Sequence, residues 1–294
     1  MFLIGEIGLN QNSDMQVCKR LIDASFATGW DCVKFQKRTP ELCVPEHQKN
    51  VMRDTPWGGM TYLEYRHKIE LHKGQYDYID WYCKQKPILW SASVWDMPSL
   101  TFLLEYDVPF IKIPSAKLTH YELVRKAAMS GKKVLLSTGM STLDEIDNAV
   151  MVLREWGDEF ALMHTNSAYP APVEDLNLSM IKTLQDRYGC EVGYSGHEQD
   201  LGPTVIAATL GATIIERHIT LDHNMWGSDH KASLEVHAMD MLQKRIKEGL
   251  LCLGDGVKKV TKKEEEMRDR LRDKHWVRGQ NDSTYPPSYR EARA

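Results

Sequence analysis

The chain has 294 residues, 42% hydrophobic and 27% charged, so it can bury a sizeable core and is neither collagen-like nor intrinsically disordered. Its net charge of -4 and the lack of a basic stretch interleaved with aromatics argue against nucleic acid as a partner, and no apolar run approaches the roughly 20 residues of a membrane span. Without a nucleic-acid partner, a small molecule is the expected ligand. The six cysteines form no CxxC pair and the N-terminus lacks signal-peptide features, so we expect a cytoplasmic protein.

Short apolar runs alternate with longer amphipathic segments along residues 1–257. The runs span residues 2–8, 31–35, 88–93, 109–113, 133–137, 160–164, 191–195 and 213–218. Their lengths suit strands that are buried on both faces. Eight such units predict an α/β fold, a (β/α)8 TIM barrel, although an open doubly wound sheet has the same periodicity.

Helix signals lie between these runs. An apolar pattern follows Ser13 and ends at Gly29, which predicts a first helix with a glycine at its C-terminal end. Ser141, followed by Asp144, predicts the start of a helix over residues 143–156. Thr119 is likewise expected to cap the helix that follows it.

Two segments depart from the alternation. Residues 36–60 form a long connection rich in Pro and Gly, and we expect it to act as a lid. Residues 258–274 hold eight positive and five negative charges and precede a polar end with Pro286 and Pro287. Residues 258–294 are therefore predicted to form a charged C-terminal helix and tail, because too few apolar residues remain there for a core.

Polar side chains gather at the C-terminal ends of the predicted strands, the face on which barrel enzymes build their sites. They are Glu6, Lys34, Gln36, Ser93, Lys112, Ser115, Ser137, Ser167, Tyr169, Ser195, His197, Glu216 and His218. A buried lysine needs a carboxylate partner or an anionic ligand. Lys34 and Lys112 would form either a cradle for phosphate or carboxylate, or barrel-interior salt bridges, for example with Glu6 and Glu216.

His197 and His218 end two successive predicted strands. Adjacent strands lie about 4.8 Å apart, so imidazoles at equivalent heights could share one metal ion. The alternative is that each histidine is simply hydrogen-bonded. A two-histidine site completed by oxygen ligands or water would suit Mn, Mg or Fe better than a closed zinc site.

Many ordered motifs over residues 2–260 resemble those of the sialic acid synthases. They are EIGLN at 6–10, VKFQ at 33–36, KIPS at 112–115, LSTGM at 136–140, TNSAYP at 165–170, GYSGH at 193–197, ERH at 216–218 and GSDHKAS at 227–233. The resemblance implies a barrel that condenses phosphoenolpyruvate with N-acetylmannosamine or a related amino-sugar aldose, using a divalent metal, Mn or Mg. TPWGG at 55–59 and WGSD at 226–229 are most similar to the animal branch, whose substrate is the 6-phosphate of N-acetylmannosamine.

The resemblance also implies roles for individual residues and a homodimeric assembly. Glu6, Lys34, Lys112 and His197 would be catalytic, and His197 and His218 would bind the metal. The contacts of phosphoenolpyruvate would be Lys34, Gln36, Ser93, Lys112, Ser115, Ser137, Ser167 and Ser195. The residues near the sugar would be Tyr169, Asp229 and Lys117.

Three features depart from the family pattern. Lys117 stands where the family usually has an acidic residue, and Gln11 and Ser13 replace the usual His and Gly. Lys117 with Gln11 could favour a more anionic sugar. The sequence is also expected to lack the small antifreeze-like domain that follows the barrel in family members, so residues 36–60, the C-terminal tail or another polypeptide would have to close the pocket.

The sequence therefore predicts a synthase that makes a sialic acid or its 9-phosphate. One alternative keeps phosphoenolpyruvate and changes the product to another ulosonic acid, such as legionaminic or pseudaminic acid. The other alternative is a non-catalytic, sugar-binding barrel.

Overall fold

The computed structural model describes residues 1–157 and 159–272 and contains a closed barrel of eight parallel strands. These are β1 (Phe2–Gly8), β2 (Cys32–Lys37), β5 (Leu89–Val94), β6 (Phe110–Ile113), β7 (Lys133–Ser137), β8 (Phe160–His164), β9 (Glu191–Gly196) and β10 (Ile214–His218). The first and last strands pair, with Leu3 opposite Ile215, and this pairing closes the ring. The predicted TIM barrel is confirmed, and the open sheet is wrong.

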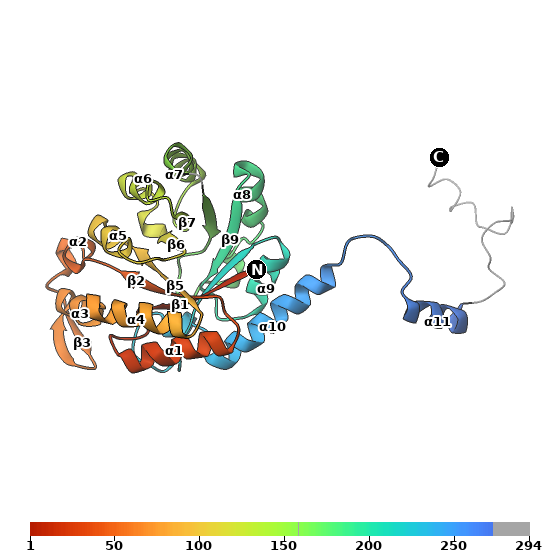
Figure 1. Cartoon of the computed structure of the whole chain (residues 1–294), viewed down its shortest axis with the longest axis horizontal. Coiled ribbons are helices and arrows are strands. Elements are labelled where there is room, and N and C mark those ends of the chain that lie inside the picture. The colour runs from red at the N-terminus through yellow and green to blue at the C-terminus, as the bar shows by residue number, and fades with distance from the viewer. Residues whose placement is uncertain (158, 273–294) are drawn as a thin grey trace. The chain divides into compact units, whose positions relative to one another are not determined.

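Helices lie outside the ring of strands (Figure 1). They are α1 (Met15–Ala27), α4 (Lys73–Gln85), α5 (Met97–Leu103), α6 (Tyr121–Ala128), α7 (Leu143–Trp156), α8 (Met180–Tyr188), α9 (Gly202–Thr209) and α10 (Val236–Leu253). Each of α1 to α9 in this set returns the chain to the start of the next strand. The carboxyl ends of all eight strands therefore meet at one mouth.

Two predicted helix starts are wrong by one residue. The N-cap of α7 is Thr142 and not Ser141, and Thr142 forms a capping box with Glu145. The N-cap of α6 is His120 and not Thr119. A hydroxyl beside a helix start is not enough to identify the cap, because the side chain must also reach the backbone N–H two or three residues later.

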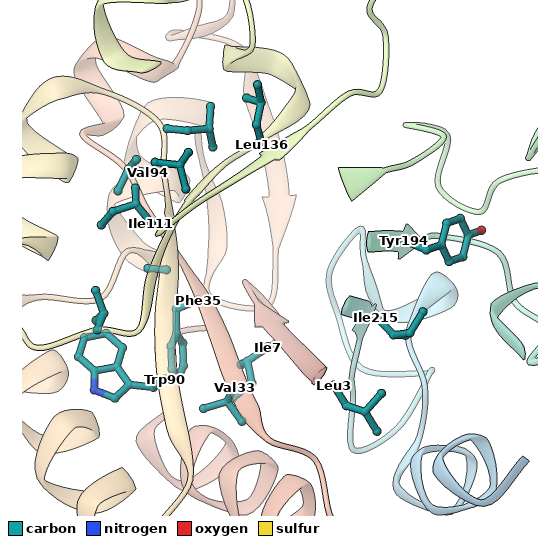
Figure 2. Close-up of a cluster of buried hydrophobic side chains, with 14 of the residues drawn as sticks. Leu3, Ile7, Val33, Phe35, Trp90, Val94, Ile111, Leu136, Tyr194 and Ile215 are labelled. Carbon is teal, nitrogen blue, oxygen red and sulfur yellow. The ribbon is translucent and has the colours of Figure 1, made fainter. Parts of the chain in front are cut away.

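The apolar core has two parts. The larger part lies between strands and helices and includes Leu3, Ile7, Val33, Phe35, Trp90, Val94, Ile111, Leu136, Tyr194 and Ile215 (Figure 2). The smaller part consists of Ile4, Cys32, Phe110, Leu135, Ala161, Met163 and Ile214. Side chains two positions apart in a strand share a face, so the positions directly beyond four members of this second cluster are Glu6, Lys34, Lys112 and Glu216. A charged layer thus lies over an apolar one inside the barrel.

The long connection after β2 has regular structure of its own. It contains α2 (Pro40–Cys43) and an antiparallel hairpin of β3 (Met52–Thr55) and β4 (Gly58–Thr61), and it leads into α3 (Tyr62–Ile69). Trp57 and Tyr65 contact the ring of Trp226 edge-on, with centroids 5.8 and 5.0 Å away. The connection is therefore a folded element that packs against the loop after β10 through these aromatic contacts.

A second unit begins at Gly254 and contains the exposed helix α11 (Lys262–Leu271), which a capping box of Thr261 and Glu264 starts. This helix falls within the segment predicted as a charged helix. The predicted tail with Pro286 and Pro287 lies outside the described residues. Within the described ranges, no helix has the length and apolar character needed to cross a bilayer.

Candidate active site

A cavity of about 160 Å³ lies at the mouth of the barrel, among the carboxyl ends of the strands. It is lined by twelve of the predicted site residues: Glu6, Lys34, Gln36, Ser93, Lys112, Ser115, Ser137, Ser167, Tyr169, Ser195, His197 and His218. All eight strands, or the loops that directly follow them, contribute to this set. The sequence therefore identified residues that are far apart along the chain but share one cavity.

Four buried charges form a chain at the base of the cavity, and we call them the charged quartet: Glu6, Lys34, Lys112 and Glu216. Lys34 Nζ lies 2.5 Å from Glu6 Oε2 and 3.6 Å from Glu216 Oε1, and Lys112 Nζ lies 2.6 Å from Glu216 Oε2. The interior salt bridges that were the alternative to an anion cradle are therefore present. Two carboxylates balance two ammonium groups, which makes burial of the quartet tolerable without a ligand.

Burial and the mutual contacts shift the pKa values of the quartet in different directions. Burial alone would raise the pKa of Glu216, but Lys112 and Lys34 outweigh burial and lower it to about 2. Burial raises the pKa of Glu6, and Lys34 offsets only part of that rise. Burial would lower the pKa of Lys34, but Glu216 and Glu6 outweigh it and raise that pKa, whereas burial prevails at Lys112 and lowers its pKa. Glu6 is therefore the carboxylate of the quartet best suited to exchange a proton.

Two hydroxyls bond directly to the quartet. Lys34 Nζ donates to Ser93 Oγ at 2.7 Å, and Ser195 Oγ donates to Glu216 Oε1 at 3.2 Å. These bonds orient the charged groups from neighbouring strands. Lys112 Nζ donates to Glu216 alone among the described residues, so its ammonium group has further hydrogens available for a ligand.

Two glycines leave room for the polar groups of the cavity. A Cβ on Gly139 would collide with Ser167 Oγ and lie 2.8 Å from Ser115 Oγ, and the Gly139 N–H donates to Ser115 Oγ at 3.1 Å. Gly8 has φ +55, and a Cβ there would lie 3.0 Å from Glu6 Oε1. A larger residue at either position would displace a group that lines the cavity.

The two predicted metal ligands lie side by side. The ring centroids of His197 and His218 are 5.5 Å apart. His197 Nδ1 donates to the carbonyl of Asn166 at 2.6 Å, so its proton is on Nδ1 and its Nε2 is free to bind a cation. Burial, reinforced by the neighbouring His218, lowers the pKa of His197 to about 3, which keeps the imidazole neutral.

These residues fit a divalent ion with open coordination positions. His218 Nδ1 is buried and has no hydrogen-bond partner among the described residues, and the carboxylate of Asp229 is 3.9 Å away. The described part of the chain holds no group of three or more His, Cys, Asp or Glu side chains placed to bind one ion. The two imidazoles would therefore need water or substrate oxygens to complete the shell, which suits Mn or Mg better than structural zinc.

The three residues predicted near the sugar lie in different places. Tyr169 lines the cavity, and its ring centroid is 4.0 Å from that of His197. Asp229 does not line the cavity but lies beside His218. Lys117 ends the 3-10 turn Ser115–Lys117, is half-buried and is not among the lining residues.

Some residues of the cavity were not predicted as site residues. Glu216 had been considered only as a salt-bridge partner, yet it contacts both lysines of the quartet. The available signal was its position two residues before His218 in one strand, which puts both side chains on the inner face. Trp95 also lines the cavity, and the guanidinium carbon of Arg38 lies 3.4 Å from the centroid of its ring. No sequence pattern singled out Arg38, because its position depends on the path of the long connection.

A buried network supports the strand end that carries His197. Arg217 Nη1 lies 3.0 Å from Glu198 Oε1, and the hydroxyls of Tyr194 and Thr204 donate to the same carboxylate at 2.8 and 2.7 Å. Glu198 follows His197 directly in the chain. A buried network of this kind, in which only Arg217 Nε is left without a partner among the described residues, restricts the backbone that carries the imidazole.

The chain is similar to several characterised synthases. A model of the NeuB family matches residues 21–258. The chain is 35% identical over 268 residues to N,N'-diacetyllegionaminic acid synthase from Campylobacter jejuni. This alignment covers 90% of this chain and 80% of that protein. It is 37% identical over 250 residues to N-acetylneuraminate-9-phosphate synthase from Drosophila melanogaster, with 84% and 67% covered. The crystal structure of N-acetylneuraminic acid synthetase from Leptospira borgpetersenii, in complex with citrate, matches with a TM-score of 0.81 at 30% identity and covers 93% of each chain.

Proposed function

Because this chain belongs to the NeuB family, we propose that it condenses phosphoenolpyruvate with N-acetylmannosamine or its 6-phosphate and releases phosphate. The product would be a sialic acid or its 9-phosphate. The observation that carries the proposal is one cavity that joins Lys34, Lys112 and strand-end hydroxyls to two adjacent imidazoles. The similarity to a legionaminic acid synthase makes another ulosonic acid the second candidate product.

Charge balance explains how such a cavity would bind phosphoenolpyruvate. The charged quartet is formally neutral, whereas phosphoenolpyruvate carries a phosphate and a carboxylate. The unused hydrogens of Lys112 and the hydroxyls of Ser115, Ser137 and Ser167 would hold these two groups. Additional positive charge would come from a proton on Glu6 or from a divalent ion, so phosphoenolpyruvate and the ion should bind with positive coupling.

In the proposed reaction, C3 of phosphoenolpyruvate forms a bond to the aldehyde carbon of the open-chain sugar, and the aldehyde oxygen takes up a proton. Water adds at C2, and phosphate leaves with its C–O bond broken. When bound by His197 and His218, Mn or Mg would polarise the aldehyde oxygen. Lys34 and Lys112 would fix the phosphate and carboxylate in place, and Glu6 would orient or deprotonate the water.

The test is coupled phosphate release by the full chain. Phosphoenolpyruvate and Mn are supplied with N-acetylmannosamine, its 6-phosphate or a panel of other aldoses, and the product is identified by mass. We expect phosphate release with at least one of the two mannosamine forms. Turnover only with another aldose would overturn the sialic assignment, and no release with any aldose would favour the non-catalytic barrel.

The metal assignment has its own test. His197→Ala should lose bound Mn, measured by elemental analysis after dialysis, and should lose phosphate release. His67→Ala is the control, because His67 is exposed and pairs with Glu41 at 2.7 Å, away from the cavity. Metal retained by His197→Ala would show that the ion binds elsewhere.

A further inference from the structure

A buried ion pair lies behind the two histidines of the cavity. Arg217 Nη1 lies 3.0 Å from Glu198 Oε1, and both side chains are fully buried. Arg217 directly precedes His218 in the chain, and Glu198 directly follows His197. Alternation along β10 puts Arg217 on the face of the strand opposite to His218, which lines the cavity. The pair therefore lies on the outer face of the barrel, beside the two strand ends that carry the imidazoles.

This ion pair joins the ends of two neighbouring strands at several points. β9 and β10 pair directly in the barrel. Besides its contact with the carboxylate, the Arg217 guanidinium donates to the backbone carbonyls of Glu198 and Asp200, the latter from Nη1 at 3.2 Å. Its Nη1 also donates to the Thr204 hydroxyl of α9 at 2.8 Å, and this hydroxyl donates to Glu198 Oε1 at 2.7 Å. A side chain of β10 thus holds the backbone that follows His197.

Gly196 leaves the space that the ion pair occupies against β9. A Cβ at this position would lie 2.6 Å from Glu198 Oε2 and 2.9 Å from Arg217 Cδ. Glu198 Oε2 also accepts from the hydroxyl of Tyr194 at 2.8 Å. The carboxylate is therefore held by side chains of β9, β10 and α9 together.

The two imidazoles depend on their backbone for their positions. His218 Nδ1 is buried and has no hydrogen-bond partner among the described residues. His197 has one strong anchor, the bond from its Nδ1 to the carbonyl of Asn166. The separation of the two rings, 5.5 Å between centroids, is therefore set mainly by the two backbone segments that the ion pair joins.

Net stability is a weak explanation for this ion pair. Loss of hydration offsets the attraction between buried charges, so an apolar pair of similar volume is often equally stable. A guanidinium contributes geometry instead, because its planar array of donors binds its acceptors in fixed directions. Loss of a group that orients metal ligands typically weakens metal affinity by about 10- to 100-fold.

We infer that Arg217 and Glu198 are positioning residues, which hold His197 and His218 at the separation needed to share one divalent ion. The inference rests on the proposed role of the two histidines in metal binding. The ion pair acts through the backbone and touches neither the ion nor the substrate. Its loss should therefore weaken metal binding by more than a loss of stability elsewhere in the barrel would.

The first experiment measures Mn binding to the full chain, without phosphoenolpyruvate, from the electron paramagnetic resonance of free Mn. The Kd should rise about 10- to 100-fold in Arg217→Met/Glu198→Leu, which removes both charges and leaves neither isolated. Arg217→Lys keeps the charge without the planar donors and should raise the Kd about tenfold. An unchanged Kd in the folded double variant would overturn the inference, and Arg217→Lys decides by the same criterion if the double variant does not fold.

Leu123→Ala is the control for lost stability. Leu123 is fully buried in α6, the helix between β6 and β7, and its truncation leaves a cavity in the core. Denaturant unfolding should show a destabilised protein, whereas the Kd for Mn should stay that of the unaltered chain. A rise in Kd as large as that of Arg217→Lys would mean that destabilisation alone weakens the site, and the positioning role would be wrong.

A second measurement follows the arrangement of the ligands and not their affinity. When Co replaces Mn, the visible absorption of the full chain reports the geometry of the groups that bind the ion. At saturating Co, the band should shift in Arg217→Lys and keep its wavelength in Leu123→Ala. An unshifted band in Arg217→Lys would show that the imidazoles keep their arrangement without the arginine, contrary to the inference.

These measurements separate failure of the inference from failure of the proposed function. If Mn binding depends on Arg217 and Glu198 but no aldose supports phosphate release, the positioning role is supported and the proposed condensation is wrong. If phosphate is released and His197→Ala loses Mn, while the double variant binds Mn as tightly as the unaltered chain, the proposed function stands and the positioning role is wrong.

Discussion

Lys112 and Glu216 meet inside the barrel from strands β6 and β10, with 2.6 Å between ammonium and carboxylate. A buried ion pair contributes little net stability, because loss of hydration offsets the attraction between the charges. Removal of one partner is different, since it leaves the other charge buried and uncompensated. The pair therefore allows a structural role to be separated from a role in binding substrate.

Lys112→Met should lower the free energy of unfolding by about 3 kcal/mol, because Glu216 then keeps only the longer of its two lysine contacts, the one with Lys34, beside its bond to Ser195. The double variant Lys112→Met/Glu216→Leu should recover most of this loss, since no isolated charge remains. Neither variant should release phosphate from phosphoenolpyruvate. Denaturant unfolding and the phosphate assay test these outcomes. Turnover by the double variant would show that Lys112 has a structural role and is not needed for phosphate release.

Among the elements, α7 shows which hydroxyl starts a helix. Thr142 accepts from the backbone N–H of Glu145, and the Glu145 side chain accepts from the Thr142 N–H in return. Thr142→Ala should lower the free energy of unfolding by about 1 kcal/mol. Ser141→Ala is the matched control and should have almost no effect. Equal losses in the two variants would contradict the assigned cap.

The elements differ in how far the sequence can predict them. Strands such as β7 and β8 were predicted with their observed ends, because a strand buried on both faces is a continuous apolar run with polar residues at its ends. The hairpin of β3 and β4 was not predicted, since its strands are largely exposed and its tryptophan contact is with Trp226, far along the chain. Long-range contacts of this kind leave no local pattern.

The same distinction applies to the candidate site. Glu6, Lys34 and Lys112 could be predicted because strand alternation and the barrel rule place their side chains inside the mouth. The stacking of Arg38 on Trp95 at the cavity wall could not, because it depends on how the connection after β2 folds. Lys117 was placed near the sugar by analogy alone, and it does not line the cavity.

At the scale of the whole molecule, closure of the barrel requires close approach of strands. A Cβ on Gly193 would lie 2.5 Å from Met163 Sδ and 2.7 Å from the backbone oxygen of Ile214, on the two strands that flank β9. Gly193→Ala should therefore push these strands apart and cost about 3 kcal/mol.

Gly189 provides the control for this substitution. It ends α8 with φ +57 and has no atom within 4 Å of its Cβ position, so Gly189→Ala should cost about 1 kcal/mol through backbone strain alone. Thermal melting and soluble yield measure both variants. A Gly193→Ala protein as stable as Gly189→Ala would mean that the strands can yield locally without loss of closure.

The folded connection after β2 touches the loop after β10 through Trp57 and Trp226, whereas the charged quartet is mounted on the strands themselves. The groups that would hold phosphoenolpyruvate thus lie on strands of the barrel, whereas the two connections at its mouth support each other through an aromatic contact. A substitution in one connection would alter the packing of the other, so we expect the two segments to vary together among relatives.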